Sequence, residues 1–415
     1  CIFFLPIALI VSLIVRFRKC SDDKPRLVWG STPIINNSYW SRSMEKYGYC
    51  SQTFTFNYYS LINERDDWDK ILAEKYYFFP LVAKPVVAFI HSLLIYDVFL
   101  LSYDGYFLGN TSLRHLQAHL LKLAGKKIVI IPYGSDGYVY RRIRSTSWIS
   151  ALMISYPGAS KNQHRIAKNV DYWNKYADAI VATGMGVDGI GRWDVLAPNS
   201  LVLDLEKWTV GSNKSSANGI DSKVVVAHSP NHRGCKGTEF IIAAVDQLKE
   251  EGLNIELRLL EGVKNDEVRN ILCEKAHILI EQLIFTGHGL SGLEGMASGI
   301  PTVSNLEDET YTLPMRRWSY LDECPLVSAT PENIVDVLRK LVTNPHLRDE
   351  LGKAGRKYVE KYHGYDSAHH LFSNVIDYIY GRKESIINLY HPILGEYPNR
   401  MPKIEHPLVK NQIAD

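Results

Sequence analysis

One acid among several glycines is the feature of this sequence that most clearly points to chemistry. The segment Phe285 to Val303, FTGHGLSGLEGMASGIPTV, holds five glycines and a single carboxylate, Glu294. Dense glycine permits tight turns and close approach to a bulky group, because glycine tolerates positive φ. A helix from Ser291 to Ser298, ended by Gly299, would turn Glu294 inward with Leu290. Such a carboxylate needs a cation or hydroxyl and N–H donors, from the protein or from a ligand. An ordinary strand-loop-helix corner is the alternative.

A second group of charged residues follows an earlier strand. The stretch HSPNHRGCKGT places Arg233 and Lys236 in a glycine-containing loop, and a helix would begin at Gly237 or Thr238. Two cations beside the free N–H groups of a helix start could hold a diphosphate, whereas a solvated basic loop is the alternative. This loop and the Glu294 loop follow strands of one predicted sheet at the same edge. We therefore expect a nucleotide with its diphosphate at the cations and its hydroxyls at Glu294.

Parallel sheets are the elements that must position these loops. Apolar runs alternate with helical patterns in two series, which is typical of sheets covered by helices on both faces. The sequence therefore predicts two Rossmann-like α/β domains facing a central cleft, with ligands at the carboxyl ends of the strands. The predicted strands of the first series are Arg26–Ser31, Asp97–Tyr103, Lys126–Gly134 and Asp178–Thr183. Those of the second series are Lys223–Ser229, Ile255–Gly262, Ala276–Leu283, Ile300–Asn305 and Pro325–Ala329.

Composition and charge exclude several classes of function. A chain of 415 residues with 46% apolar content has room for two domains with large cores. A net charge of +2 gives no reason to expect a nucleic-acid partner. The six cysteines lack CxxC or CxxH spacing, so they indicate neither a zinc site nor a disulfide framework and are expected to be reduced.

The start of the chain is strongly apolar. Fifteen almost wholly apolar residues, CIFFLPIALIVSLIV, precede Arg16, Arg18 and Lys19. Fifteen residues are fewer than the roughly 18 to 20 that span a bilayer. Because the sequence begins with Cys, we expect upstream residues and interpret residues 1–20 as a truncated membrane anchor, with the rest of the chain cytoplasmic. A buried or signal-like segment is the alternative. The apolar run from Tyr76 to Tyr96 contains prolines and a lysine, and we expect it to be buried or interfacial.

The two charged loops together resemble a known family. HSPNHRGCKGT, about forty further residues, and ILIEQLIFTGHGLSGLEGMASGIPTV resemble the donor-binding domain of group-1, family-four-type glycosyltransferases with the GT-B fold. The resemblance covers Lys223 to Lys361. It implies that Arg233 and Lys236 bind the donor diphosphate, that Glu294 contacts the donor ribose, and that no metal or other cofactor is needed. It also implies sugar transfer, with retention of configuration, from a nucleoside-diphosphate sugar to a glycan or lipid-linked acceptor.

The chemistry of this transfer assigns roles to both loops. Negative charge develops on the leaving diphosphate, so fixed cations should supply much of the catalysis. We therefore predict Arg233, Lys236 and Glu294 as the catalytic residues. Backbone amides of the glycine-rich loop could donate to the phosphates or the sugar. The predicted donor-binding residues are Gly237, Thr286, Gly287, His288, Gly289, Leu290 and Ser291.

Two positions depart from the family pattern. The family often has a second glutamate eight residues before the first, where this chain has Thr286. The first domain often places a histidine after a strand where this chain has Tyr103 and Asp104. Two alternatives therefore stay open beside the transferase. One is a GT-B scaffold that binds a nucleotide or glycan with little or no turnover, and the less favoured one is a GT-B sugar-nucleotide epimerase.

Polar residues in the first domain are candidates for acceptor contacts. They follow predicted strands on the cleft side, although glycine and serine at strand ends often serve only as turns. The predicted acceptor-side residues are Gly30, Ser31, Asp104, Ser135 and Asp136.

Three other motifs are weaker signals. TGMGVDG, from Thr183 to Gly189, has GxGxxG spacing but lacks a long helix behind it, so we favour an interdomain loop. Asp67 and Asp69 have DxD spacing but sit where acids are favoured near a helix start. His369 and His370 would point in different directions from one helix, which makes a poor metal pair.

Domain boundaries follow from these patterns and from the resemblance. In GT-B proteins the last helix commonly crosses back onto the first domain, and we expect the same here. The predicted parts are an anchor at 1–20, an acceptor domain at 21–208, a polar linker at 209–222, a donor domain at 223–361, a crossing helix at 362–385 and an extended tail at 386–415.

Overall fold

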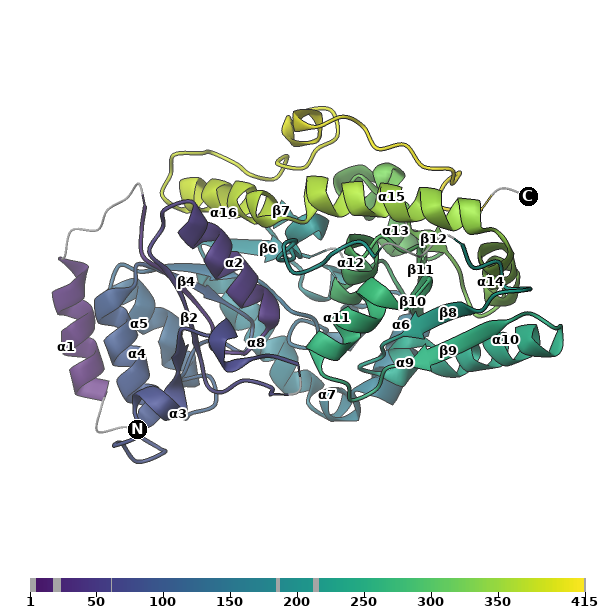
Figure 1. The fold of residues 1–415 in the computed structure, drawn as a ribbon. Coiled ribbons are helices and arrows are strands. Elements are labelled where there is room, and N and C mark those ends of the chain that lie inside the picture. Colours follow the sequence, from purple (N-terminus) through teal and green to yellow (C-terminus); the bar gives the residue numbers. More distant parts are fainter. Residues whose placement is uncertain (1–4, 18–23, 61, 184–186, 212–215, 414–415) are drawn as a thin grey trace. The chain divides into compact units, whose positions relative to one another are not determined.

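The chain forms two compact α/β units. The computed structural model describes residues 5–17, 24–60, 62–183, 187–211 and 216–413 (Figure 1). Unit 1 comprises residues 1–142, 162–197 and 368–389, and unit 2 comprises 143–161, 198–367 and 390–415, so far as they are described. Each unit contains one parallel sheet with helices packed on it. The prediction of two Rossmann-like α/β units is confirmed.

Unit 1 is built on a seven-stranded sheet. Its strands are all parallel, in the order β3-β2-β1-β4-β5-β6-β7. The central strands are apolar and fully buried, as expected for a sheet covered on both faces. The strands are β1 (Leu27–Trp29), β2 (Ser51–Thr55), β3 (Lys70–Ile71), β4 (Val98–Leu101), β5 (Lys127–Ile130), β6 (Ala179–Ala182) and β7 (Val195–Leu196). The helices are α1 (Leu5–Arg16), α2 (Ile35–Lys46), α3 (Leu72–Lys75), α4 (Lys84–Ile95), α5 (Gln117–Leu123), α8 (Gln163–Tyr176) and most of α16 (Tyr365–Ile379).

Unit 2 has a five-stranded parallel sheet that carries both charged loops. Its order is β12-β11-β10-β8-β9, so β8 and β10 are neighbours although they are far apart in sequence. The strands are β8 (Val224–His228), β9 (Ile255–Leu259), β10 (Ile278–Thr286), β11 (Thr302–Asn305) and β12 (Val327–Ser328). The helices are α6 (Thr146–Ser155), α7 (Pro157–Lys161), α9 (Arg233–Lys236), α10 (Thr238–Glu250), α11 (Asn265–Glu274), α12 (Leu290–Ala297), α13 (Glu309–Trp318), α14 (Ile334–Thr343) and α15 (Pro345–Tyr362).

Helix α6 belongs to unit 2, although the predicted boundary at residue 208 places it in the first domain. Trp148 is buried, with its ring centroid 4.9 Å from that of Phe285 and 4.3 Å from that of Tyr311. The backbone N–H of Cys235 in α9 donates to Ser155 Oγ over 3.0 Å. The Trp148 side chain is buried against apolar residues of unit 2, which explains why residues 143–161 pack there.

The chain returns to unit 1 through α16. From Ala368 onward the helix packs in unit 1, where the Phe372 ring lies 4.8 Å from that of Trp29 and 5.5 Å from that of Trp40. The segment from Tyr390 onward belongs to unit 2. It contains a short 3₁₀ helix at Tyr397–Arg400 and an isolated bridge between Val409 and Gln412. Side-chain bonds such as those from Asn411 Nδ2 to two carbonyls of unit 2 fix it in place.

Helix α1 is attached to unit 1 through a narrow stripe. Ala8, Ser12 and Val15 are its buried residues, and it packs against α4 and α5. Among the described residues, no helix has both the length and the apolar composition to cross a membrane. The ends of the predicted anchor, residues 1–4 and 18–20, lie outside the described part of the chain.

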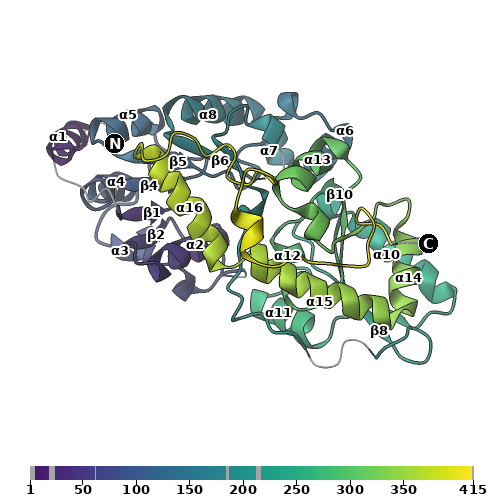
Figure 2. The ribbon, with the colours of Figure 1, turned by 90° about the horizontal axis from the view of Figure 1, so that it is seen from above.

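Close packing between α12 and α15 fixes the orientation of the glycine-rich segment. The two helices lie side by side in unit 2 (Figure 2). A Cβ added to Gly352 of α15 would lie 2.1 Å from the backbone oxygen of Gly299, which follows α12. Only glycine allows the helices to approach this closely, since the obstacle is a backbone atom that cannot rotate away.

We expect Gly352→Ala to lower the free energy of unfolding by about 2 kcal/mol, because the new methyl group must push α15 away from Gly299. Denaturant unfolding followed by circular dichroism measures this change. Gly158→Ala is the control, because a Cβ on this helical glycine meets no heavy atom within 4 Å. Equal stability of the two variants would show that the α12–α15 contact is looser than the structure describes.

Candidate functional site

The two charged loops meet at the carboxyl edge of the unit 2 sheet. The β8 loop leads into α9, a single helical turn that carries Arg233 and Lys236, so these residues do not lie in the open loop that the sequence suggested. Gly237 separates α9 from α10 with a φ of 70°, a left-handed conformation that favours glycine. Neighbouring β10 leads into the glycine-rich loop and α12. Residues more than forty positions apart are thereby brought into hydrogen-bonding distance.

Lys236 contacts two polar residues of β10. Its Nζ lies 3.4 Å from Glu281 Oε1 and 3.2 Å from Gln282 Oε1. The Glu281 side chain is completely buried and that of Lys236 is 12% exposed. A buried carboxylate requires a nearby cation or several donors, so this ion pair is a structural necessity as well as a source of positive charge at the site.

Glu281 also determines the shape of the glycine-rich loop. Its Oε1 accepts hydrogen bonds from the Gly289 N–H over 2.7 Å and from Ser291 Oγ over 3.0 Å. A Cβ on Gly292 would lie 2.1 Å from Glu281 Oε2, so a glycine is required where α12 passes the carboxylate. Glu281 Oε2 is buried and has no hydrogen-bond partner among the described residues. One carboxylate thus connects α9, the loop and the start of α12, and retains one oxygen for a further donor.

Glu294 is a second buried acid near Glu281. It is only 8% exposed, and no side-chain hydrogen bond to it is found within the described ranges. Burial, reinforced by the charge of Glu281, raises the pKa of Glu294 to about 8, whereas Lys236 and Arg269 act in the opposite direction. The carboxyl group is therefore largely protonated at neutral pH until hydroxyl or cationic groups approach it.

Arg233 is turned away from this acid pair. It is exposed, and its guanidinium bonds to Glu239 Oε1 over 2.7 Å and to Glu261 Oε2 over 2.8 Å. Exposed ion pairs of this kind contribute little stability, so an anionic ligand could replace the two acids at small cost. The structure therefore brings Lys236, but not Arg233, into contact with a buried acid, Glu281.

Two neutral histidines meet at the glycine-rich loop, His288 within the loop and His363 against it. His288 is buried, and neither of its ring nitrogens makes a hydrogen bond of normal geometry in the part of the chain described. Its ring stands edge-on to that of His363, with centroids 5.4 Å apart. Burial lowers the pKa of both, that of His363 to about 3, so neither carries a charge at neutral pH. His288 can thus offer a neutral donor or acceptor, but not a positive charge.

The backbone amides of the predicted donor loop are partly engaged. The Gly287 N–H donates to Asn305 O over 2.9 Å, and the Gly289 N–H is held by Glu281. Leu290 and Ser291 are the first residues of α12, where amides have no intrahelical acceptor. The predicted row of amide donors from 287 to 291 is therefore reduced, with Leu290 and Ser291 the best placed to meet a ligand.

Thr286 ends β10 and is buried. It pairs with Asn305 of β11 and occupies the position where the resemblance led us to expect a glutamate. The structure supplies an acid five residues earlier in the chain instead, at Glu281. Sequence reasoning missed Glu281 and Gln282. The signal was present in the run ILIEQLIF, where two adjacent polar residues interrupt an otherwise apolar buried strand.

The predicted acceptor-side residues of unit 1 mostly stabilise turns. Asp136 is buried and accepts from the backbone N–H groups of Tyr103, Tyr133 and Gly134, each over 3.0 Å. Burial, with a smaller effect from Asp104, raises its pKa above the ordinary value. Asp104 itself accepts from the Tyr133 hydroxyl over 2.7 Å.

The other predicted acceptor-side residues follow β1 and β5. The backbone oxygen of Ser31 accepts from the Phe56 N–H over 3.1 Å, and Gly30 lies against the backbone of Phe54. Ser135, in the turn after β5, is partly exposed. These contacts show how the turns are held, and acceptor binding by any of the five residues stays a prediction.

The weaker motifs have structural roles where they are described. Asp67 accepts from the Glu64 N–H over 2.9 Å, and Asp69 accepts from the backbone and hydroxyl of Thr53. His369 stacks on Tyr47, with centroids 3.8 Å apart. Gly184 and Gly186 of the GxGxxG spacing fall outside the described residues. Among those that are described, no three His, Cys, Asp or Glu side chains gather as metal ligands would.

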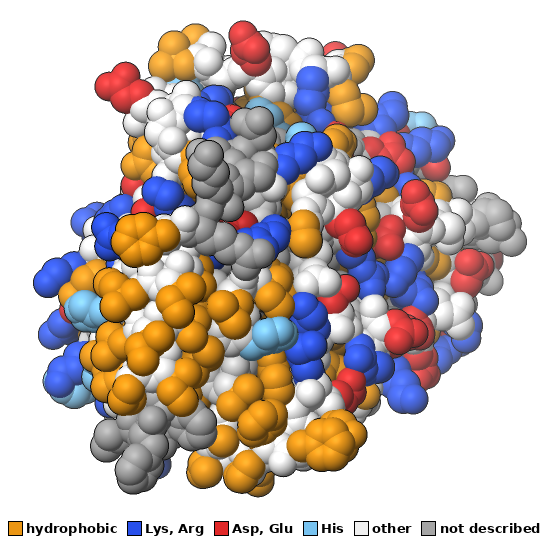
Figure 3. Space-filling model, turned by 90° about the vertical axis from the view of Figure 1, so that its left-hand side faces the viewer, with side chains coloured by type: hydrophobic (Ala, Val, Ile, Leu, Met, Phe, Trp, Pro, Cys, Tyr) orange, Lys and Arg blue, Asp and Glu red, His pale blue; other side chains and the backbone are white. Residues whose placement is uncertain are grey.

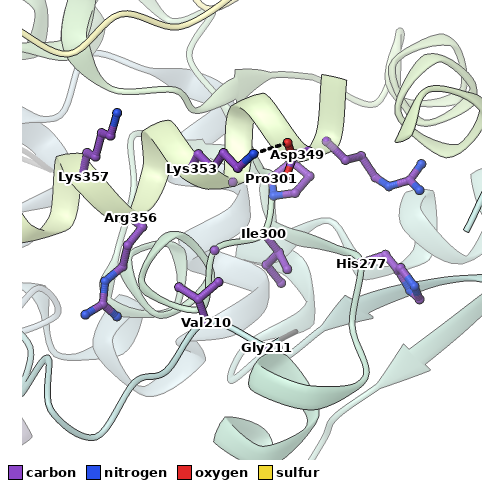
Figure 4. Close-up of a pocket in the computed structure, with 12 residues that line it drawn as sticks. Val210, Gly211, His277, Ile300, Pro301, Asp349, Lys353, Arg356 and Lys357 are labelled. Carbon is purple, nitrogen blue, oxygen red and sulfur yellow. Dashed lines mark hydrogen bonds and ion pairs between the residues drawn. The ribbon is translucent and has the colours of Figure 1, made fainter. Parts of the chain in front are cut away.

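A cavity of about 290 Å³ lies at the opposite end of α12 from this acid pair. It is bordered by the segment Gly299 to Pro301 and by α15, two of whose basic side chains, Lys353 and Arg356, are already bonded (Figure 4). Lys353 bonds to Asp349 over 2.6 Å, and Arg356 donates to the Ala297 carbonyl over 2.9 Å. The cavity is therefore separate from the buried acids, which form the chemically distinctive part of unit 2.

Comparison with known proteins gives structural similarities only. No family model and no curated protein matches the sequence. The solved structures that resemble it include S. aureus MnaA with UDP, at 12% identity and a TM-score of 0.47, with 88% of this chain and 98% of that one covered. Another is a UDP-glucosyltransferase from Polygonum tinctorium capable of glucosylating indoxyl (10%, TM-score 0.42, 85% and 99% covered). A third is the wall teichoic acid polymerase TagF (10%, TM-score 0.40, 92% and 95% covered).

These similarities carry no functional argument at such identities and TM-scores. The structure itself defines an α/β protein of two parallel-sheet units. The buried acids Glu281 and Glu294 lie with Lys236 at the carboxyl edge of the second sheet. That edge is where ligands of parallel α/β sheets bind.

We expect strong energetic coupling between Lys236 and Glu281. Lys236→Met leaves the buried carboxylate without its cation and should lower the free energy of unfolding by about 3 kcal/mol. The double variant Lys236→Met/Glu281→Gln has neither charge. Its loss of unfolding free energy should therefore be at least about 1 kcal/mol smaller than the summed losses of Lys236→Met and Glu281→Gln. Denaturant unfolding of the four proteins measures the coupling.

The matched control is the surface pair Lys223 and Glu256, whose side chains are 55% and 28% exposed. The same substitutions there should show coupling below about 0.5 kcal/mol. If the two pairs coupled equally weakly, Glu281 would not be the buried anchor of the site.

Proposed function

We propose that this chain is a glycosyltransferase of GT-B type. It would transfer a sugar from a nucleoside-diphosphate sugar to a glycan or lipid-linked acceptor. The observation that carries the proposal is the convergence of Lys236, Glu281 and Glu294 at the carboxyl ends of two adjacent parallel strands. A cation beside buried acids suits a ligand that carries both negative phosphates and hydroxyl groups.

Each residue has a proposed role in donor binding. Lys236 approaches the diphosphate and stabilises the charge that develops on it as the sugar leaves. Arg233 exchanges its surface partners Glu239 and Glu261 for the same phosphates. Glu294 accepts hydrogen bonds from ribose hydroxyls, which supply the donors that its buried carboxyl group lacks. The amides of Leu290 and Ser291, at the start of α12, add donors of the kind that phosphate groups bind.

The proposed reaction uses the charges of the chain itself and requires no metal or organic cofactor. Retention of configuration belongs to this proposal because the two charged loops resemble those of family-four-type enzymes. Glu281 is a positioning residue in this scheme, since it holds Lys236, Gly289 and Ser291 in place. The neutral ring of His288 belongs to the loop that would face the donor.

A donor-binding scaffold with little turnover is the second candidate. The observation that favours it is Thr286, a buried residue without a carboxylate where the resemblance leads one to expect an acid. Both candidates bind a nucleotide at the same place. They differ in whether the glycosidic bond of the donor is broken.

Titration calorimetry with a panel of nucleoside diphosphates tests the donor site. We expect one member of the panel to bind, and Lys236→Ala to weaken its binding by about tenfold or more, because a charge-assisted contact to phosphate is lost. Arg233→Ala should weaken binding by a smaller factor, since this arginine must first leave two acids. Unchanged affinity in both variants would refute the assignment of the diphosphate site.

Lys223→Ala is the control for that titration, because Lys223 is an exposed lysine of unit 2 paired with Glu256. A donor-hydrolysis and transfer assay on the same proteins separates the two candidates. Sugar release or transfer supports the glycosyltransferase, whereas binding without either supports the scaffold.

The affinity for a nucleoside-diphosphate sugar should rise with pH. Ribose hydroxyls bind the ionised form of Glu294, so binding lowers its pKa from about 8 and releases a proton. Affinity is therefore expected to increase as pH rises from the acid side and to level off above about 8. Both phosphates of such a donor are fully ionised across this range, and His363 has already lost its proton.

Glu294→Gln should bind more weakly and remove this pH dependence, as measured by calorimetry at several pH values. A pH dependence that persists in Glu294→Gln would mean that another group releases the proton on binding. An affinity that falls as pH rises would contradict hydroxyl binding by the carboxylate.

A further inference from the structure

One face of unit 1 exposes a continuous apolar surface. Figure 3 shows hydrophobic side chains gathered over α1 and over the segment between α3 and α4. We call this surface the apolar face. Its most exposed members are Ile10 (57%), Ile14 (64%), Phe17 (84%), Tyr77 (65%), Phe78 (82%), Leu81 (81%) and Val82 (74%). Scattered exposed apolar residues are normal on soluble proteins, but a contiguous patch of this kind marks an interaction site.

Helix α1 has the reverse of the pattern expected of a surface helix. Its buried stripe consists of the small residues Ala8 and Ser12 together with Val15, whereas its larger apolar side chains point outward. A helix that packs on a soluble protein normally turns its large apolar residues toward the core. The outward face of α1 is therefore built to meet an apolar environment outside unit 1.

The loop between α3 and α4 adds aromatic side chains to the same face. The rings of Tyr77 and Phe78 lie in contact at an interplanar angle of 36°, with centroids 3.7 Å apart, and Leu81 and Val82 of the same loop are also exposed. Aromatic residues are enriched where proteins meet the boundary between lipid headgroups and acyl chains. Pro80 limits regular structure in this loop, which leaves its side chains free to enter such a boundary.

Charge identifies the kind of partner. Three segments build or adjoin the apolar face, namely residues 5–17, 75–96 and 105–135. None of them contains Asp or Glu. Arg16, Lys75 and Arg114 are exposed cations in these segments. The nearest acid in sequence to the aromatic loop, Glu74, is neutralised by Arg65 at 2.7 Å. An apolar surface with cations and no acids complements an anionic lipid surface.

A second copy of the chain fits this face less well. Two copies meeting through the apolar face would bring cations of the same sign together without acids to pair them, which is unfavourable. A bilayer that contains anionic lipids satisfies both the apolar side chains and the cations.

We propose that unit 1 docks onto an anionic membrane surface through the apolar face, with α1 lying in the interface and the aromatic loop inserted beside it. This inference stands without the proposed function. If the proposed function also holds, the same docking would bring unit 1 to the lipid phase and favour a lipid-linked acceptor over a free glycan.

Vesicle co-sedimentation of the 415-residue chain tests this proposal. The probes are phosphatidylcholine vesicles with and without about 30% phosphatidylglycerol. We expect binding to the anionic vesicles, weaker binding to the neutral ones, and release of part of the protein at high salt. We test two double variants, Phe78→Glu/Leu81→Glu and Ile10→Glu/Ile14→Glu. Each should lower the vesicle partition coefficient by about tenfold or more.

Ile393→Glu/Leu394→Glu is the matched control, because these two residues of unit 2 are 85% and 67% exposed. It should bind vesicles as the unchanged chain does. Thermal unfolding of every variant confirms that each is folded, since all the substituted side chains are exposed.

Three results would overturn the proposal. The first is failure of the folded chain to bind either kind of vesicle. The second is an equal loss of binding in the control variant. The third is a dimer, detected by light scattering, that the apolar-face variants dissociate, which would assign the face to self-association. Nucleotide affinity measured in parallel keeps the two proposals apart, since the donor site lies in unit 2 and the apolar face in unit 1.

Discussion

The buried carboxylate of Glu281 is the constraint on which the site of unit 2 depends. An ionised carboxyl group without water must be surrounded by donors or cations. Here these are the Lys236 ammonium, the Gly289 amide and the Ser291 hydroxyl. All three groups bond to the same atom, Glu281 Oε1. This requirement fixes the positions of α9, the glycine-rich loop and the start of α12. The glycine at 292 follows from the same requirement, because any side chain there would collide with the carboxylate.

Burial and the neighbouring charge of Glu281 together set the protonation of Glu294. Two acids in one buried region cannot both ionise without cost, and the one with fewer partners retains its proton. Glu281 has a cation and two donors. Glu294 makes no side-chain hydrogen bond within the described residues, and burial together with the charge of Glu281 raises its pKa. The carboxyl group of Glu294 is thus largely protonated at neutral pH. A ligand rich in hydroxyl groups would complete its hydrogen bonding.

Much of the fold could be predicted because parallel sheets leave a direct mark on sequence. Strands such as β4, β5, β6 and β8 are short, mainly apolar runs, and each coincides with a predicted strand. Strand β2 was missed because SQTFT is mostly polar. Its Ser51 and Thr53 side chains are buried with hydrogen bonds to Trp29 and Asp69. Helix α6 was assigned to the wrong neighbours because its partners, reached through Trp148, lie more than a hundred residues away in sequence.

The sequence by itself determined the two-unit α/β architecture, the two charged loops and the inward position of Glu294, since these follow from local periodicity and glycine spacing. It could not show that Lys236 contacts Glu281, that Arg233 faces other acids, or that Gly287 and Gly289 use their amides internally. Nor could it show which side of α1 is buried. These features were decided only by tertiary structure, because a hydrogen bond or ion pair between distant residues depends on how neighbouring strands and helices pack.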